Sequence, residues 1–388
     1  MLRVSSLAAD GPGSLRAALE VEGARIVVFE VGGVIDLGGR DLRIQHPFIT
    51  VAGQTAPEPG ITIIRGGLFV TGHDVILRHI RVRPGANGAA PRSGWEVDGL
   101  STRSAWNVII DQCSLSWSTD ENLSASGPRF EGGQTVEDWR QNTSRKISFT
   151  RNIVAEGLSN SSHSKGEHSK GSLIHDNATD ILIAGNLYAH NYERNQLFKG
   201  GAHAVSANNL IYDPGNRCMH YALNASEWVG HPWEVGQLSI VGNVTRGGNS
   251  TRADLPFLIV EGQGDLDLYA ADNPAIHADG RPFDRLGVIS DGTPVIRTLR
   301  RAPGWPAGFR ARPSDQVEAW VTAEAGARPW SRDDVDRRIL ENVRAGTGRI
   351  IDDEREVGGY PRPAPTQRPF VEPDWNLVDM TRRDGRPS

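Results

Sequence analysis

The sequence predicts an all-β solenoid, in which short strands wind into successive coils. A phrase of apolar alternation, one polar residue and a second apolar pair recurs as DVILRHIRV, NVIIDQCSL, KISFTRNIV, DILIAGNLY, HAVSANNLI and QLSIVGNVT. Aligning the phrases brings six residues into one column: His79, Gln112, Asn152, Asn186, Asn209 and Asn243. The gaps are irregular, and the shortest, from Asn186 to Asn209, is 23 residues. Such spacing is typical of solenoid coils with insertions at their turns, whereas propeller blades repeat more evenly.

The asparagines of this column are predicted to be structural. An asparagine at the same corner of each coil adopts left-handed backbone angles at low cost and stacks its amide on the next coil. We therefore assign the column to the scaffold and not to the chemistry.

The solenoid is expected to have a helical cap at its N-terminal end. Ser14 is a suitable N-cap for the segment LRAALEVEG, and ARIVVFEVGGVIDL then reads as two strands broken by Gly32 and Gly33. A helix before the first coil would cover its apolar interior.

The repeated phrase stops near residue 265, which suggests a β-helix domain at 1–265 and a C-terminal extension at 266–388. Two helices are predicted in the extension, one opened by Ser314 and one opened by Ser331 and ended by Gly346. We expect the extension to pack on the solenoid.

Composition excludes several classes of protein. No run of about 20 apolar residues exists to span a bilayer, and the net charge of -5 argues against a nucleic-acid partner. Cys113 and Cys218 are expected to be buried thiols. The first residues lack the apolar core of a signal peptide, so either the protein stays inside the cell or its signal precedes this sequence. We favour the second alternative and expect a secreted or periplasmic protein. A capped solenoid is expected to be a monomer.

Acidic residues gather in one stretch of the repeats: Glu96, Asp98, Asp111, Asp120 and Glu121. Residues one coil apart stack at about 4.8 Å, so carboxylates of consecutive coils converge on one cation. Hard oxygen ligands favour calcium. Taken singly, each acid is equally well explained as an ordinary turn residue.

Basic residues follow in the next coils: His163, Lys165, His168, Lys170, Arg194 and Lys199. A cation site beside such a ridge suits an anionic glycan. The pair of histidines in HSKGEHSK resembles a zinc ligand set, but it lies outside a helix, and solvated surface is the preferred interpretation.

Four longer segments carry a family resemblance: VAGQTAPEPGITI, NVIIDQCSLSWSTDEN, IVAEGLSNSSHSKGEHSKGSLI and LYAHNYERNQLFKGG. Together they resemble the pectate lyase superfamily, in particular the bacterial branch related to family-one pectate lyases. The resemblance implies a right-handed parallel β-helix and a calcium-assisted polysaccharide lyase that cleaves a uronate polymer, above all pectate or polygalacturonate, by β-elimination.

The resemblance also implies roles for single residues. Calcium ligands match Asp98 and Asp120, with Glu96 and Glu121 as further candidates, while Asp111 matches a structural position. The catalytic base of an RxPxxR motif matches Arg194 in RNQLFK, where Gln196 and Lys199 replace the proline and the second arginine. Lys170 or its close competitor Lys165 contacts substrate, and Lys199 and His168 are placed with them. An arginine base implies an alkaline pH optimum.

Two other functions remain open at this stage. A glycoside hydrolase on the same scaffold would use two of Asp111, Asp120 and Glu121 as acid and base. A non-catalytic glycan-binding protein would use tryptophans as sugar platforms, the candidates being Trp95, Trp117, Trp228 and Trp233.

Overall fold

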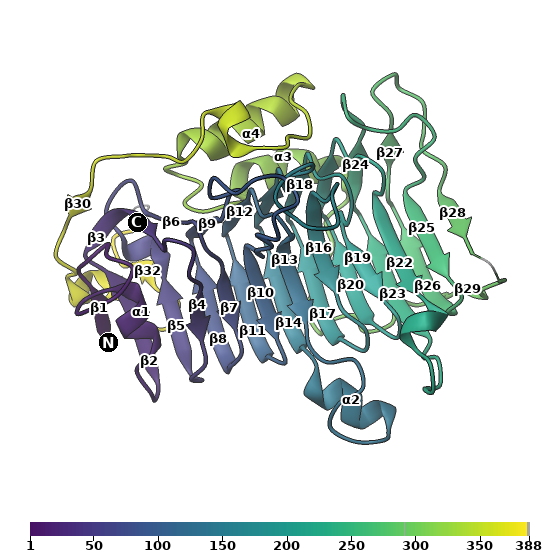
Figure 1. The fold of residues 1–388 in the computed structure, drawn as a ribbon, viewed down its shortest axis with the longest axis horizontal. Helices are drawn as coiled ribbons and strands as arrows, with labels where there is room; N and C mark the ends of the chain where they lie inside the picture. The colour runs from purple at the N-terminus through teal and green to yellow at the C-terminus, as the bar shows by residue number, and fades with distance from the viewer. Residues whose placement is uncertain (291, 386–388) are drawn as a thin grey trace.

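The computed structural model describes residues 1–290 and 292–385, and its parallel strands form three long sheets along one axis (Figure 1). The first sheet comprises β1 (Leu2–Val4), β2 (Arg25–Phe29), β5 (Ile49–Ala52), β8 (His73–Arg78), β11 (Trp106–Asp111), β14 (Arg145–Thr150), β17 (Thr179–Ala184), β20 (His203–Ala207), β23 (Gly236–Val241), β26 (Leu266–Ala271) and β29 (Ile296–Thr298). The second sheet comprises β3 (Val31–Asp36), β6 (Ile61–Ile64), β9 (Ile80–Arg83), β12 (Ser114–Ser116), β15 (Ile153–Ala155), β18 (Leu187–Ala189), β21 (Leu210–Tyr212), β24 (Val244–Arg246), β27 (Ala275–Ile276) and the antiparallel β30 (Thr366–Gln367). The third sheet comprises β4 (Leu42–Ile44), β7 (Leu68–Val70), β10 (Leu100–Arg103), β13 (Glu121–Ser126), β16 (Lys170–Ile174), β19 (Leu197–Lys199), β22 (Met219–Leu223), β25 (Leu258–Gly262) and β28 (Leu286–Ile289).

The chain therefore forms a parallel β-helix, and its core is a set of apolar columns. Leu77, Ile110, Phe149 and Ile183 follow one another in register across β8, β11, β14 and β17, and each is fully buried. Each coil covers the apolar residues of the next, so these side chains are shielded from solvent along the axis. Parallel pairing continues past residue 265 through β26 to β29, so the coils extend further than the repeated phrase.

An asparagine ladder runs along the corner between the first and second sheets. Asn152, Asn186, Asn209, Asn243 and Asn273 each accept the backbone N–H of the preceding coil, and the ladder starts at the N–H of Cys113, 2.8 Å from Asn152 Oδ1. The predicted scaffold role is thus supported by a continuous chain of amide hydrogen bonds, which is buried from Asn152 to Asn243.

The predicted column is wrong at its first two positions. His79 and Gln112 stand in register with Arg151, one residue before the ladder. The left-handed backbone also falls in that preceding column, with φ of 56° at His79, 51° at Gln112 and 51° at Arg151, and not on the asparagines themselves. The tight turn and the amide stack are therefore made by adjacent residues.

The N-terminal end is capped by helix α1 (Leu15–Leu19), as predicted. Ser14 Oγ accepts the N–H of Ala17 at 3.2 Å, and the buried Leu15 and Leu19 belong to the main core. The strand break lies at Glu30, however, and Gly32 and Gly33 lie inside β3.

The C-terminal extension contributes the 3-10 turn η3 (Ser314–Gln316) and helices α3 (Val317–Glu324) and α4 (Asp334–Ala345), which lie over the second sheet (Figure 1). Gly346, with φ of 69°, ends α4 as predicted. The predicted N-caps are wrong. The hydroxyl of Ser314 donates to Asp272, and that of Ser331 donates to Glu58, while Asp333 caps α4.

Burial and charge hold this extension in place. Val321 and Ile339 pack with Leu187 of β18 in one buried cluster, and the buried Arg83 of β9 donates to Asp336 at 2.8 Å. Breaking such a buried pair from one side would cost several kcal/mol.

The remaining elements decorate the solenoid: α2 (Val136–Asn142), η1 (Gly53–Thr55), η2 (Ala225–Glu227), η4 (Glu354–Val357), η5 (Glu372–Asp374), β31 (Trp375–Asn376) and β32 (Thr381–Arg382). Within residues 1–290 and 292–385, none of the helices is long and apolar enough to cross a membrane. Cys113 and Cys218 are buried free thiols, as predicted.

Candidate active site

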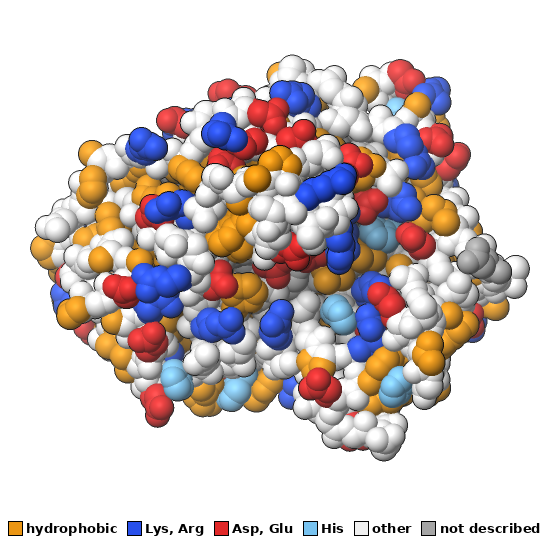
Figure 2. All heavy atoms as spheres, in the orientation of Figure 1, with side chains coloured by type: hydrophobic (Ala, Val, Ile, Leu, Met, Phe, Trp, Pro, Cys, Tyr) orange, Lys and Arg blue, Asp and Glu red, His pale blue; other side chains and the backbone are white. Residues whose placement is uncertain are grey.

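The predicted acidic and basic residues meet where strands of the third sheet begin. Glu121 opens β13 and is paired in register with Lys170, which opens β16. Asp98 lies two residues before β10, and Asp120 directly before β13. Figure 2 shows acidic, basic and histidine side chains close together in the hollowed centre of this face. A separate cavity of about 1080 Å³ lies between α4 and residues 357–363 and is lined by none of these residues.

Three carboxylates form the acidic part of the site. Asp98, Asp120 and Glu121 each offer an oxygen within 4.8 Å of the others, and Asp98 Oδ1 accepts the N–H of Glu121 at 3.2 Å. Burial and the charge of Asp120 raise the pKa of Asp98 to about 7. Burial also opposes ionisation of Asp120, but the hydrogen bond from His168 and nearby positive charge lower its pKa overall. Such a cluster needs a compensating cation.

Arg194 is the cation that reaches this cluster directly. Its guanidinium forms an ion pair with Glu121, and its side chain is 24% exposed. The residue has a left-handed backbone with φ of 57°, which turns the chain just before β19. Burial lowers the pKa of Arg194, while the charges of Asp120, Asp98 and Glu227 act in the opposite direction.

The structure separates the two candidate lysines. Lys170 is buried, and its Nζ donates to Glu193 Oε2 at 2.8 Å, while Asn216 donates to Glu193 Oε1 at 2.9 Å. Burial opposes ionisation of Glu193, but Lys170 and Asn216 lower its pKa to about 2. Lys165, in contrast, is exposed on the loop before β16. Lys170 is therefore the one placed beside the carboxylates.

Lys199 lies at the other end of its strand. Its Nζ forms an ion pair with Glu227, which is also 3.6 Å from Arg129. Arg129 in turn lies 2.9 Å from the buried Asp176. This second charged group is offset along the third sheet from Arg194 by the length of β19.

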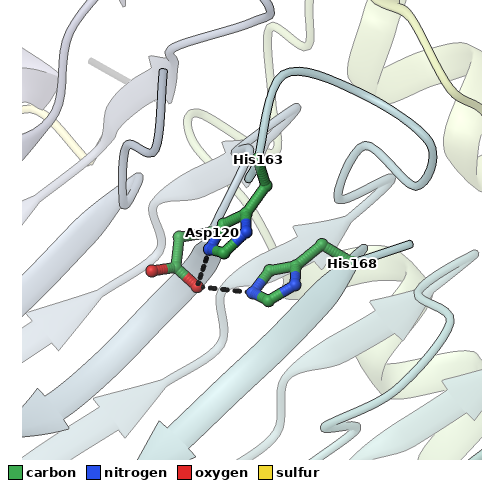
Figure 3. A group of neighbouring side chains, drawn as sticks. All are labelled: Asp120, His163 and His168. Atoms are coloured by element: carbon green, nitrogen blue, oxygen red, sulfur yellow. Dashed lines mark hydrogen bonds and ion pairs between the residues drawn. The ribbon is translucent and has the colours of Figure 1, made fainter. Parts of the chain in front are cut away.

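Glu96 lies apart from the three clustered acids. Its Oε1 accepts the N–H of Ser164 at 2.9 Å and lies 3.6 Å from His163 Nδ1. One prediction for this region is wrong. The histidines of HSKGEHSK are not solvated surface: His163 is 1% and His168 5% exposed. Both rings point at Asp120 (Figure 3), with His168 Nε2 at 2.8 Å from Oδ1.

Sequence patterns missed His220 and Glu193. His220 lies on β22, in register with Leu197 of β19, and is buried next to the charges of Glu193 and Arg194. Burial lowers the pKa of His220 to about 3, so the ring is neutral. Its segment, CMHYAL, has the alternation of an ordinary core strand, which gives no sign of a site.

The structure also tests the residues of the two alternative functions. Asp111 binds Arg78 at 2.9 Å and Arg151 at 2.7 Å, in the structural role predicted for it. Trp117 and Trp228 are buried, with their indole N–H groups bound to Glu156 and Asp176. Trp233, at 49% exposure, remains a surface tryptophan.

Comparison with curated relatives shows that this chain is a carbon–oxygen lyase that acts on polysaccharides. A probable pectate lyase C from Emericella nidulans is 31% identical over 361 residues, covering 92% of this chain and 74% of the relative. Another, from Neosartorya fischeri, is 31% identical over 360 residues, covering 92% and 76%. The chain belongs to the pectate lyase family. No model of a known protein family matches the sequence.

Solved structures show the same fold at much lower identity. The major cedar pollen allergen Jun a 1 has a TM-score of 0.53 at 15% identity, covering 84% of this chain and 88% of that one. The thermostable pectate lyase PL 47 has a TM-score of 0.50 at 14% identity, covering 84% and 91%. These likenesses confirm the predicted parallel β-helix.

Proposed function

We propose that this enzyme is a calcium-dependent pectate lyase that cleaves polygalacturonate by β-elimination, with Arg194 as the base. The observation that carries the proposal is the contact of the Arg194 guanidinium with the three-carboxylate cluster on the third sheet. A base and a cation site in contact are what the removal of a proton next to a carboxylate requires.

The acidic residues suit calcium. Asp98, Asp120 and Glu121 supply only oxygen ligands, which calcium prefers, and burial of Asp98 beside Asp120 makes their shared negative charge costly without a cation. Bound there, calcium would neutralise the uronate carboxylate and acidify the proton next to it. Glu96 is left out of this ligand set because it is held by Ser164.

Arg194 would take the proton from C5 of the uronate at the cleavage site. The electron pair of that C–H bond forms the C4–C5 double bond, the C4–oxygen bond breaks, and the leaving oxygen is protonated by water. A guanidinium is ordinarily protonated, but burial lowers the pKa of Arg194. When a divalent cation occupies the carboxylates, Arg194 loses part of the negative charge that retains its proton.

Lys170 and Lys199 would hold neighbouring uronate carboxylates. Lys170 lies next to Glu121 in register, and Lys199 lies further along β19. In the structure, Lys170 pairs with Glu193 and Lys199 pairs with Glu227, and these glutamates hold the two ammonium groups in place. A lysine makes point contacts where an arginine would bind a carboxylate bidentately, so the grip at Lys199 is looser.

The test is production of unsaturated uronate ends from polygalacturonate at alkaline pH, followed by ultraviolet absorbance. We expect turnover with calcium, none with chelator, and a loss of at least a thousandfold in Arg194→Ala, the upper range for general base removal. Lys165→Ala is the matched control, since that lysine is exposed, and it should keep wild-type turnover. Chelator-resistant turnover would exclude the calcium role.

The substrate also bears on where the enzyme works. A long uronate polymer does not enter cells, so we infer a secreted or periplasmic enzyme. Because helix α1 covers the first coil of the solenoid, we also infer that the enzyme is a monomer. Fractionation of the native organism, with size-exclusion chromatography of the purified chain, checks both, and a cytoplasmic or dimeric protein would refute them.

A further inference from the structure

The stacked histidines beside Asp120 form, together with that carboxylate, a second group of possible metal ligands. His163 and His168 stack with 3.6 Å between ring centroids and 14° between planes. Their Nε2 atoms lie 3.8 Å and 2.8 Å from the same oxygen, Asp120 Oδ1 (Figure 3). The ligand atoms of all three residues lie within 4.8 Å of one another.

The donor atoms of this group differ from those of the calcium set. Calcium takes oxygen ligands, whereas imidazole suits Zn²⁺, Ni²⁺ and Co²⁺. Asp120 belongs to both groups, so an oxygen half (Asp98, Asp120 and Glu121) and an imidazole half (Asp120, His163 and His168) share one carboxylate. Two imidazoles that are nearly excluded from water, with one carboxylate, match the number and kinds of ligand in zinc sites that use three protein side chains.

A support for the imidazole half is also present. Glu96 Oε1 lies 3.6 Å from His163 Nδ1 and is fixed by the N–H of Ser164 at 2.9 Å. A carboxylate behind a ligating histidine orients the ring and raises its basicity. Glu96, which is not among the proposed calcium ligands, would thus orient His163 in the imidazole site.

We propose that the imidazole half binds one first-row transition metal ion, and that this ion weakens calcium binding through the shared Asp120. Loading requires the two rings to tilt apart from their stack, and His163 Nδ1 must exchange its hydrogen bond from the Lys165 N–H, now 3.1 Å, for Glu96. Both changes are confined to the loop that carries the histidines. The inference rests on the proposed function only through Asp120 as a calcium ligand.

Because linkage is reciprocal, each metal lowers the affinity for the other by the same factor. Two like charges on one carboxylate repel, so occupation of the imidazole half should reduce calcium affinity about thirtyfold, the middle of the usual coupling range. Zinc would then act as an inhibitor of a calcium-dependent enzyme.

The test is calorimetric titration of the full-length protein with Zn²⁺ and, separately, Ca²⁺. Wild type should bind one Zn²⁺, and His163→Gln with His168→Gln should weaken it at least about a hundredfold, beyond the second-shell effect. Glu121→Gln should weaken Ca²⁺ but leave Zn²⁺ within a few fold. His46→Gln is the control for adventitious histidine binding and should change neither.

Cobalt gives a second readout that does not depend on affinity. Co²⁺ bound by two imidazoles should show visible ligand-field absorption that disappears in either single variant, His163→Gln or His168→Gln, once circular dichroism confirms that the variant is folded. Zn²⁺ binding unchanged in the double variant, or Zn²⁺ and Ca²⁺ lost together in Glu121→Gln, would overturn the proposal. Neither readout involves turnover, so a protein inactive on polygalacturonate leaves this test intact.

Discussion

Replacing Asn186 with alanine should destabilise the solenoid strongly, because that side chain is a fully buried rung of the asparagine ladder. Its Oδ1 accepts the backbone N–H and the Nδ2 of Asn152 at 2.8 Å and 2.9 Å. Its Nδ2 donates to Phe149 O and to Asn209 Oδ1, both at 2.9 Å. The N–H of Asn152 would be left buried without this partner, which costs about 1–3 kcal/mol. Each of the three other bonds contributes about 1 kcal/mol, so we expect the free energy of unfolding to fall by about 5 kcal/mol.

Asn273→Ala is the matched comparison, since Asn273 makes the same contacts with Asn243 at 3.0 Å and 3.1 Å. Asn273 is only half-buried, so water replaces its bonds and we expect a loss of about 1 kcal/mol. Urea unfolding followed by circular dichroism measures both free energies, and turnover of the folded Asn186→Ala enzyme should equal that of wild type. Equal losses in the free energy of unfolding for the two variants would refute the reasoning, because burial would then contribute nothing to the strength of the ladder.

Three further predictions concern charge and pH. Because the base must be unprotonated, log(kcat/KM) of the wild-type enzyme should rise with pH into the alkaline range. A lysine has an ordinary pKa of about 10.4, so log(kcat/KM) of Arg194→Lys should reach its plateau at a lower pH than that of wild type. A flat pH–rate profile of the wild-type enzyme would exclude an arginine base. The pKa of Asp98 is raised from 3.8 to about 7, so without calcium the free energy of unfolding falls as pH rises through that window. Above pH 7, Asp98→Asn should therefore be more stable than calcium-free wild type by roughly 4 kcal/mol, measured by urea unfolding. No gain in stability would mean that the charge of Asp98 is already compensated. The pKa of Glu193 is lowered from 4.5 to about 2, so the ionised side chain stabilises the fold above pH 4.5, and this stabilisation disappears as pH falls to about 2. Wild type should therefore be more stable than Glu193→Gln at neutral pH, and the difference should vanish in acid. A difference that does not depend on pH would show that the charge of Glu193 is not its cause.

The sequence was sufficient to predict the coils, because every coil repeats the same apolar columns. Leu77, Ile110, Phe149 and Ile183 carry this signal, since each must face the interior. The exact corner residue was not predictable in the first coils. In the segments of His79 and Gln112 no asparagine follows the left-handed turn residue. The polar residue at that corner is the turn residue itself, which lies one position before the ladder.

The site divides in the same way. Asp98, Asp120, Glu121 and Lys170 lie at strand starts on consecutive coils, and register alone brings them together. Glu96, His163 and His168 lie on long loops, whose paths depend on contacts distant in sequence, such as the Ser159 N–H to Ile351 O bond at 2.9 Å. No local sequence pattern specifies the paths of these loops, so the sequence alone predicts that the histidines lie at the surface. The predicted helix N-caps are wrong for the same reason, because the hydroxyls of Ser331 and Ser314 donate to the distant carboxylates of Glu58 and Asp272.

The most direct test of the central claim is mass spectrometry of the oligosaccharides released from polygalacturonate with calcium present. Elimination with Arg194 as base predicts fragments lighter by one water molecule than their hydrolytic counterparts, formed by wild type and Lys165→Ala and absent from Arg194→Ala. The fragment that carries the original non-reducing end keeps the full hydrolytic mass under either mechanism, because the leaving oxygen stays on it. A digest that contains only fragments of full hydrolytic mass, or unsaturated fragments that persist in a folded Arg194→Ala enzyme, would contradict the account.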